Sequence, residues 1–450
     1  MYHNINSTGM SIRKTIIVSF VSFFITTLAS AQESKPTQND SLSLEQVMQQ
    51  VITNHPVIKK AESSLNEADS KIGLAKSGYY PTIDASLSVS HIGPVPELSF
   101  PGFGSFQLYP ENNFNASVNL HQNIYDFGKT STNISFANSS KELVEQTIEG
   151  TKQQLATQVI NNFFALVYFQ QAVHIKDLEI QNLQSHLEFI KKKKETGSAT
   201  DFEIITTQVK LSAVQNQKID IVAAQQLQLA ILNSLLGEPA NKEHWVKNTL
   251  EMDIDEMEGD SLISSAIQNR FEAQLAKKKI ELATIHLDAV KAQNNPSILF
   301  MADGGFKNGY VPDINELRAN YMVGIGVSVP IFEGTRAKQN ESIASIAIET
   351  STLESEITKR KISTEVVENE VTFNKSIQKV NQAKLQLSQA KEAFKLAQVS
   401  FKTGAITNLE LLDASTNVSE SELLYIKSEI DYILSYYMLQ ASLGTELYKL

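Results

Sequence analysis

An alternating stretch decides the fold: residues 321–331 read YMVGIGVSVPI. Every second residue is a large apolar one, and glycine and serine are common between them. Three other runs, 83–89, 114–124 and 298–306, alternate in the same way. Successive side chains of a strand point to opposite faces, so these runs predict four strands, each with one apolar face.

The length of these strands points to a membrane. Each is close to the ~9 to 11 residues that cross a bilayer as a tilted strand. A half-buried sheet in a soluble protein alternates in the same way. Asn, Ser and Gly on the second face favour a water-filled lumen over charged solvent contact. The connections, residues 92–112 and 308–318, are rich in Gly, Pro and aromatic residues and are expected to be extracellular loops.

Four strands cannot close a barrel, because the smallest barrels have about eight. An open edge in lipid would leave unpaired backbone groups at a cost of several kcal/mol each. The sequence therefore predicts an oligomer, and a trimer would give twelve strands.

The two halves of the chain resemble each other. Residues 125–128, 194–197 and 235–237 match 331–334, 401–404 and 442–444, at offsets of 206, 207 and 207. Chance similarity between helices is the alternative, but ordered matches at one offset favour duplication. We expect a first repeat at 32–237, an equatorial linker at 238–259 and a second repeat at 260–450.

The remaining segments have a helical pattern, and each copy contains three of them. The expected helices are 43–78, 129–195 and 201–236 in the first copy and 260–294, 335–402 and 406–443 in the second. At ~1.5 Å per residue each long helix reaches ~100 Å. Two short helices placed end to end match one long helix. The long helix should therefore run from the membrane to a distant tip, with short helices covering its two halves and apolar seams of coiled-coil period between them.

The N-terminus has the pattern of a signal peptide, residues 1–31. Arg13 and Lys14 precede an apolar run, 15–28, and Ala29-Ser30-Ala31 ends the segment. A membrane anchor is the alternative, but the run is shorter than the ~20 residues of a spanning helix. No later stretch approaches 18 consecutive apolar residues, so no transmembrane helix is expected in the mature chain.

Composition excludes several classes of protein. Arg13 and Lys14 are two of the 39 basic residues, so the mature chain has 37 against 50 acidic residues and a net charge of −13. Nucleic-acid binding is not expected at that charge. The absence of cysteine excludes disulfides, thiolate metal sites and a lipid-bearing N-terminal cysteine. No phosphate-binding Gly-rich loop, catalytic spacing or paired histidines occur, so we expect no enzyme, cofactor or metal.

At residues 403–414, TGAITNLELLDA, and more faintly at 196–203, TGSATDFE, the chain resembles the outer membrane efflux (TolC) family. The resemblance covers essentially all of the mature chain. It implies a mostly α-helical homotrimer in the outer membrane, with a 12-stranded β-barrel and a periplasmic barrel of coiled-coil helices. It also implies a periplasmic adaptor at the tips and an inner-membrane pump of the RND, ABC or MFS type.

The resemblance implies an acidic constriction near the tips, formed by Glu410, Asp413 and Glu203. Residues at i and i+3 share a helix face, so Glu410 and Asp413 from three chains would present six carboxylates, which favour cations. Solvated surface acids beside an apolar seam are the alternative. Ile406 stands where a basic tip residue can pair with an acid, and residue 410 is Glu rather than Asp, so the pattern departs from a salt-bridge lock.

The turns between helices are the expected adaptor-docking surface. Gly197 and Gly404 allow a tight turn and close approach of a partner backbone. The surface comprises Thr196, Gly197, Ser198, Ala199 and Thr200 in the first copy and Thr403, Gly404, Ala405, Ile406 and Thr407 in the second. Residues 191–194 are four lysines, which could attract an acidic adaptor or could simply be solvated.

Two functions fit these features. The first is a passive export duct for toxic small molecules or for polypeptides, in the outer membrane with its helices in the periplasm. The second is a non-conducting coiled-coil structural protein of the periplasm or cell surface. Only the first accounts for both the strands and the signal peptide.

Overall fold

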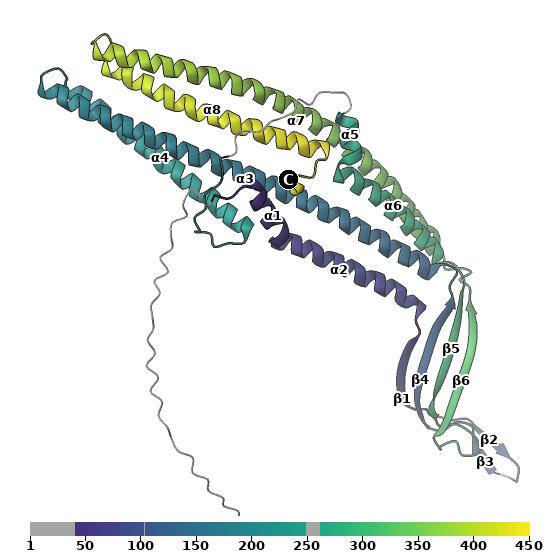
Figure 1. Ribbon diagram of the computed structural model, residues 1–450. Helices are drawn as coiled ribbons and strands as arrows, with labels where there is room; N and C mark the ends of the chain where they lie inside the picture. Colours follow the sequence, from purple (N-terminus) through teal and green to yellow (C-terminus); the bar gives the residue numbers. More distant parts are fainter. Residues whose placement is uncertain (1–40, 103, 249–261) are drawn as a thin grey trace, which may run out of the picture.

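The computed structural model describes residues 41–102, 104–248 and 262–450. A long layer of helices leads into a β-sheet at one end (Figure 1). The predicted signal peptide, part of the predicted linker and its acidic residues at 253–258 lie outside the described residues.

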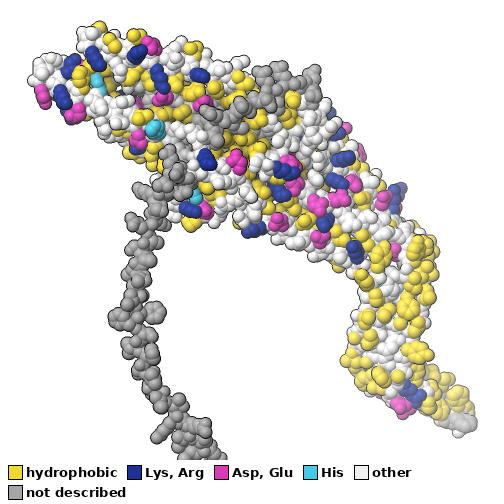
Figure 2. Space-filling model, in the orientation of Figure 1, with side chains coloured by type: hydrophobic (Ala, Val, Ile, Leu, Met, Phe, Trp, Pro, Cys, Tyr) yellow, Lys and Arg dark blue, Asp and Glu magenta, His cyan; other side chains and the backbone are white. Residues whose placement is uncertain are grey.

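The sheet has four antiparallel strands in the order β1-β4-β5-β6, so β1 and β6 are its outer strands. The bounds are Thr82–His91, Asn112–Tyr125, Ser297–Lys307 and Arg318–Ser328. Register places Ala302 between Leu120 and Val323 on one face, and Asp303 between Asn119 and Met322 on the other. The apolar face is uncovered in one chain, with Tyr321 85% and Ile325 70% exposed. Figure 2 shows hydrophobic side chains gathered over this end of the molecule.

The loop after β1 contains a second, smaller hairpin that the sequence did not predict. Strands β2, Glu97–Phe100, and β3, Gly104–Gln107, pair with each other beyond the end of the main sheet (Figure 1). Leu98 lies opposite Phe106 in this pair. The four-residue strands are bounded by Pro and Gly, which hid their short alternation among turn signals.

The helical layer is built around two long helices. They are α3, Lys129–Glu195, and α7, Arg336–Lys402, of 67 residues each. Helix α3 packs on α2, Pro56–Lys76, and then on α4, Asp201–Leu236. Helix α7 packs on α6, Phe271–Ala292, and then on α8, Asn408–Leu443. Contacts of α3 with α6 and α8 join the two halves of the chain.

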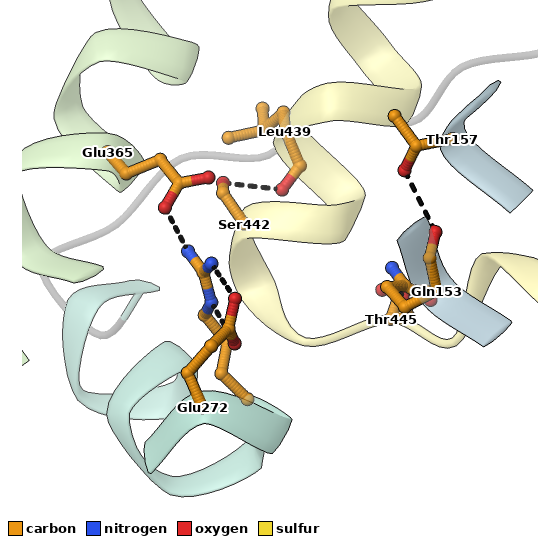
Figure 3. Close-up of polar contacts among 8 residues, drawn as sticks. Gln153, Thr157, Glu272, Glu365, Leu439, Ser442 and Thr445 are labelled. Carbon is orange, nitrogen blue, oxygen red and sulfur yellow. Dashed lines mark hydrogen bonds and ion pairs between the residues drawn. The ribbon is translucent and has the colours of Figure 1, made fainter. Parts of the chain in front are cut away.

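The prediction of one continuous helix before each strand pair was wrong. The first segment is broken into α1, Leu44–Asn54, and α2, because Pro56 lacks an N–H and disfavours helical geometry at His55. The second is broken into α5, Leu262–Asn269, and α6 at Arg270, which has extended geometry. The Arg270 guanidinium pairs with Glu272 at 2.5 Å and with Glu365 of α7 at 2.7 Å (Figure 3). Burial disfavours the charged form of Arg270 and by itself would lower its pKa. Hydrogen bonds and attraction from the two carboxylates outweigh burial, so the pKa is raised.

The main apolar core lies midway along the helices, and we call it the equatorial core. It joins α1, α3, α4 and α8 to the short C-terminal helix η3, Leu447–Lys449. Phe163 and Phe164 are fully buried there, with ring centroids 5.5 Å apart. One smaller apolar cluster lies between this core and the tips, and another lies at the tips themselves. Most of the cohesion of one chain is therefore at its middle.

Candidate functional site

The predicted turns lie at the end of the helices opposite the sheet (Figure 1). Gly197 and Gly404 have φ of 75° and 77°, in the left-handed region that glycine adopts without strain. A Cβ at either position would meet no atom within 4 Å, so backbone conformation rather than space favours glycine.

Both turns are followed by a capping box, which joins an N-cap threonine to the glutamate three residues later. The Thr200 backbone N–H donates to Glu203 Oε2 at 2.7 Å, and the Glu203 N–H donates to Thr200 Oγ1 at 3.3 Å. Thr407 and Glu410 form the same pair of bonds at 2.7 and 3.3 Å. Two of the three predicted constriction acids therefore stabilise helix starts. The Thr-x-x-Glu spacing was visible in the sequence, but its capping role was not recognised there.

The capping box lowers the pKa of Glu410, because the backbone N–H of Thr407 and then its hydroxyl donate to the carboxylate. A depressed folded pKa means that the stabilising contribution is present above the ordinary value of 4.5 and is lost as the pH falls through the folded value. Relative to an unprotected amide at the same pH, we expect acid to reduce the protection of the Thr407 amide from exchange more in the wild type than in Glu410→Gln. Glutamine keeps an acceptor but does not titrate. A constant ratio of the two exchange rates from neutral to about pH 3 would contradict this.

Asp413 is exposed, one turn beyond Glu410 on α8. Among the hydrogen bonds and ion pairs of the described residues, none joins the side chain of Glu203 to Glu410 or Asp413. The constriction formed by these three acids stays a prediction. Their predicted meeting depends on other copies of the chain.

The two tips share a small apolar core formed by Ile190, Phe401 and Leu411. Ala199 and Ile406, two of the ten residues predicted to dock a partner, are half-buried against it. They occupy corresponding positions of the two turns and face inward. Their position supports packing of the tips rather than a free contact surface.

Asn408, the first residue of α8, is buried and was missed by sequence reasoning. Its Nδ2 donates to Thr207 Oγ1 at 3.1 Å, and its Oδ1 accepts from His186 Nε2 at 2.7 Å. His186 lies well before the first turn and Thr207 well after it. The second turn therefore lies roughly 10 Å behind the first along the helix axis. The first turn projects furthest from the sheet.

The lysines before the first turn are largely engaged within the chain. Lys191 pairs with Glu188 at 2.7 Å, and Lys194 pairs with Asp201. Lys193 Nζ lies 5.0 Å from the Phe401 ring centroid. These contacts favour a structural role over attraction of an acidic partner.

The chain belongs to the outer membrane efflux protein family, whose model matches residues 47–238 and 262–445. The toluene efflux pump outer membrane protein TtgC of Pseudomonas putida is 21% identical over 415 residues, covering 89% of this chain and 83% of its own. The outer membrane protein TolC of Vibrio cholerae is 19% identical, covering 96% of each chain. The CmeC outer membrane channel of Campylobacter jejuni matches with a TM-score of 0.74 and 17% identity, over 90% of this chain and 86% of its own.

These comparisons confirm the resemblance, the outer-membrane location and the periplasmic position of the helices. The family and fold are those of efflux channels rather than enzymes.

Proposed function

We propose that the chain is one protomer of a trimeric exit duct that conducts cargo passively across the periplasm and outer membrane. One observation carries this proposal: a four-stranded sheet with an exposed apolar face and two outer strands, β1 and β6. Such a sheet is stable in lipid only when its edges are paired. Pairing β6 of one copy with β1 of the next would close twelve strands from three copies.

The edges of the helical layer support the same assembly. In the half toward the tips the helices pack in the order α4-α3-α8-α7, so α4 and α7 lie at the edges. Exposed apolar residues follow α4 and α7 at spacings near those of a coiled-coil seam. They are Phe202, Ile205, Val209, Ile219, Leu227 and Ile231 on α4, and Val367, Val371, Leu385, Leu396 and Val399 on α7. We assign these faces to contacts between protomers.

Helix α4 is also the described helix that is long and apolar enough to cross a membrane by length and composition, although glutamines interrupt its apolar residues. Only 22% of its most apolar window is buried in one chain. It packs along α3 at the end of the molecule opposite the sheet. A protomer seam accounts for its composition at that position better than a bilayer does.

The tips are the proposed docking surface for a periplasmic adaptor, with energy supplied by an inner-membrane pump of the RND, ABC or MFS type. The projecting first turn, with Thr196, Gly197 and Ser198 exposed, would be reached first. Relatives named for toluene and antibiotic efflux favour small toxic molecules over secreted polypeptides as cargo.

Reconstitution of the purified full-length protein tests this function. We expect trimers in detergent, fractionation with outer membranes and ion conduction in planar bilayers. A monomer that releases from the periplasm and conducts nothing would instead support the coiled-coil structural protein.

The proposed acidic constriction has its own test, which the capping boxes sharpen. Replacing Glu410 with Gln and Asp413 with Asn removes the charges but keeps an acceptor for Thr407. We expect higher single-channel conductance and a weaker preference for cations, because rings of carboxylates favour cations. Thr407→Ala, which weakens the cap without removing charge, is the control. If the neutralised channel keeps wild-type selectivity, the constriction lies elsewhere.

A further inference from the structure

A buried cluster of charge lies on the seam between α3 and α8, between the equatorial core and the tips. The side chains of Lys176 and Glu179, which we call the buried pair, are each only 4% exposed. Lys176 Nζ lies 2.8 Å from Glu179 Oε2. Ser419 of α8 donates its hydroxyl to the same oxygen at 2.5 Å and accepts from Lys176 Nζ at 3.3 Å.

The buried pair interrupts an apolar seam. Toward the middle of the molecule the seam continues into the equatorial core, where Phe164 of α3 meets Tyr437 of α8 with ring centroids 5.9 Å apart. Toward the tips it continues into a small cluster of Leu183, Val214 and Leu412. The charged pair is therefore buried at one point along the α3–α8 contact, and the contact is apolar both above and below that point along the helices.

Both charged residues belong to α3, and α8 contributes only Ser419. If α8 moved away, the ion pair would stay intact and only the two bonds of Ser419 would be lost. Water could replace both bonds and hydrate both charges. Burying an ion pair costs much of its Coulombic gain in desolvation, and parting the helices returns that desolvation energy. Separating two helices at an apolar contact returns no desolvation energy and exposes apolar surface to water.

We infer that the buried pair makes this level of the α3–α8 seam a parting point, which lets the tip half of α8 leave α3 while the equatorial core holds the helices together. The inference rests on the proposed function, since a conducting tip must be able to widen. It assigns to Lys176 and Glu179 a positioning role in that movement.

The cysteine-free chain allows a direct test. In full-length protein, Ser419→Cys places one thiol in the seam, and its reaction with a water-soluble maleimide measures how often the seam opens. Lys176→Met with Glu179→Met should slow this labelling roughly tenfold, because apolar replacements of buried ion pairs usually stabilise the closed contact. Without the cysteine, the same pair of changes should raise the melting temperature by about 2 °C or more and lower the open probability in bilayers.

A matched control lies on the same helix. Glu188 and Lys191 have the same i,i+3 spacing at 2.7 Å, but their side chains are 62% and 45% exposed. Changing both to methionine should leave the labelling rate and open probability unchanged, since exposed pairs contribute little.

Unchanged or faster labelling in the methionine variant overturns the inference, as does a lower melting temperature. If that variant does not fold, Ser419→Ala is tested in its place. This change leaves the buried Glu179 carboxylate without one hydrogen bond, so the open probability should rise several-fold. An unchanged open probability would also overturn the inference. A wild type that conducts nothing, but whose labelling follows these expectations, would refute the proposed duct and not the parting point.

Discussion

Replacing Phe164 with alanine is expected to lower the free energy of unfolding by about 3–5 kcal/mol, the largest effect we foresee for a single residue in the helical part. Phe164 is 1% exposed and packs against Phe163 and Tyr437. Its ring therefore joins α3 to α8 in the equatorial core. Truncation removes apolar burial and leaves a cavity that the surrounding helices can fill only in part.

The measurement is denaturant unfolding of the purified protein, followed by the loss of helical circular dichroism. Leu178→Ala is the control, because Leu178 lies on the same helix but is 45% exposed. We expect less than about 1 kcal/mol from that change. Similar losses in the two variants would show that cohesion is spread evenly along α3 and is not concentrated at the middle.

Replacing Ile325 with arginine is expected to cost about 2–4 kcal/mol in a membrane. Ile325 lies near the middle of β6, pairs with Phe300 and is 70% exposed on the apolar face. If that face meets lipid, the guanidinium must be buried in hydrocarbon or distort the bilayer to reach water. The folded protein should become less stable, and less of it should reach the outer membrane.

Met322→Arg provides the matched control, because Met322 lies on the same strand but shares the opposite face with Asp303 and Asn119. In a water-filled lumen the new charge stays hydrated, so stability should change little while ion selectivity shifts toward anions. Equal destabilisation by the two arginines, assayed by refolding into lipid vesicles, would contradict the assignment of faces.

Local patterns in the sequence were enough to predict the elements. Glycine-bounded helical segments placed α3 at 129–195 and α4 at 201–236, as observed. Period two located the four strands and their apolar face. These patterns depend only on neighbouring residues, so they survive without tertiary information. The break at Pro56 was equally local and was overlooked, whereas the break at Arg270 is accompanied by an ion pair with Glu365 on a different helix.

Much of the candidate site could not be read from local patterns. The burial of Asn408 and the stagger of the two turns depend on how the hairpins pack against each other. The position of Ile406 also depends on this packing: the sequence predicted it on a docking surface, whereas in the structure it packs against the apolar core of the tips. Residue type and spacing carry no information about which face of a helix another helix will cover.

The two lysine–glutamate pairs of α3 show this limit most directly. Lys176 with Glu179 and Glu188 with Lys191 have the same residue types and the same spacing, and each pair lies within hydrogen-bonding distance. The sequence by itself determined that the two members of each pair are within reach of one another, because residues three apart on a helix are neighbours. Only the tertiary structure decided that α8 covers one pair and leaves the other in water. The free-energy cost of a charge depends on its access to water. The exposed pair therefore has little effect on stability, whereas the buried pair has a large one.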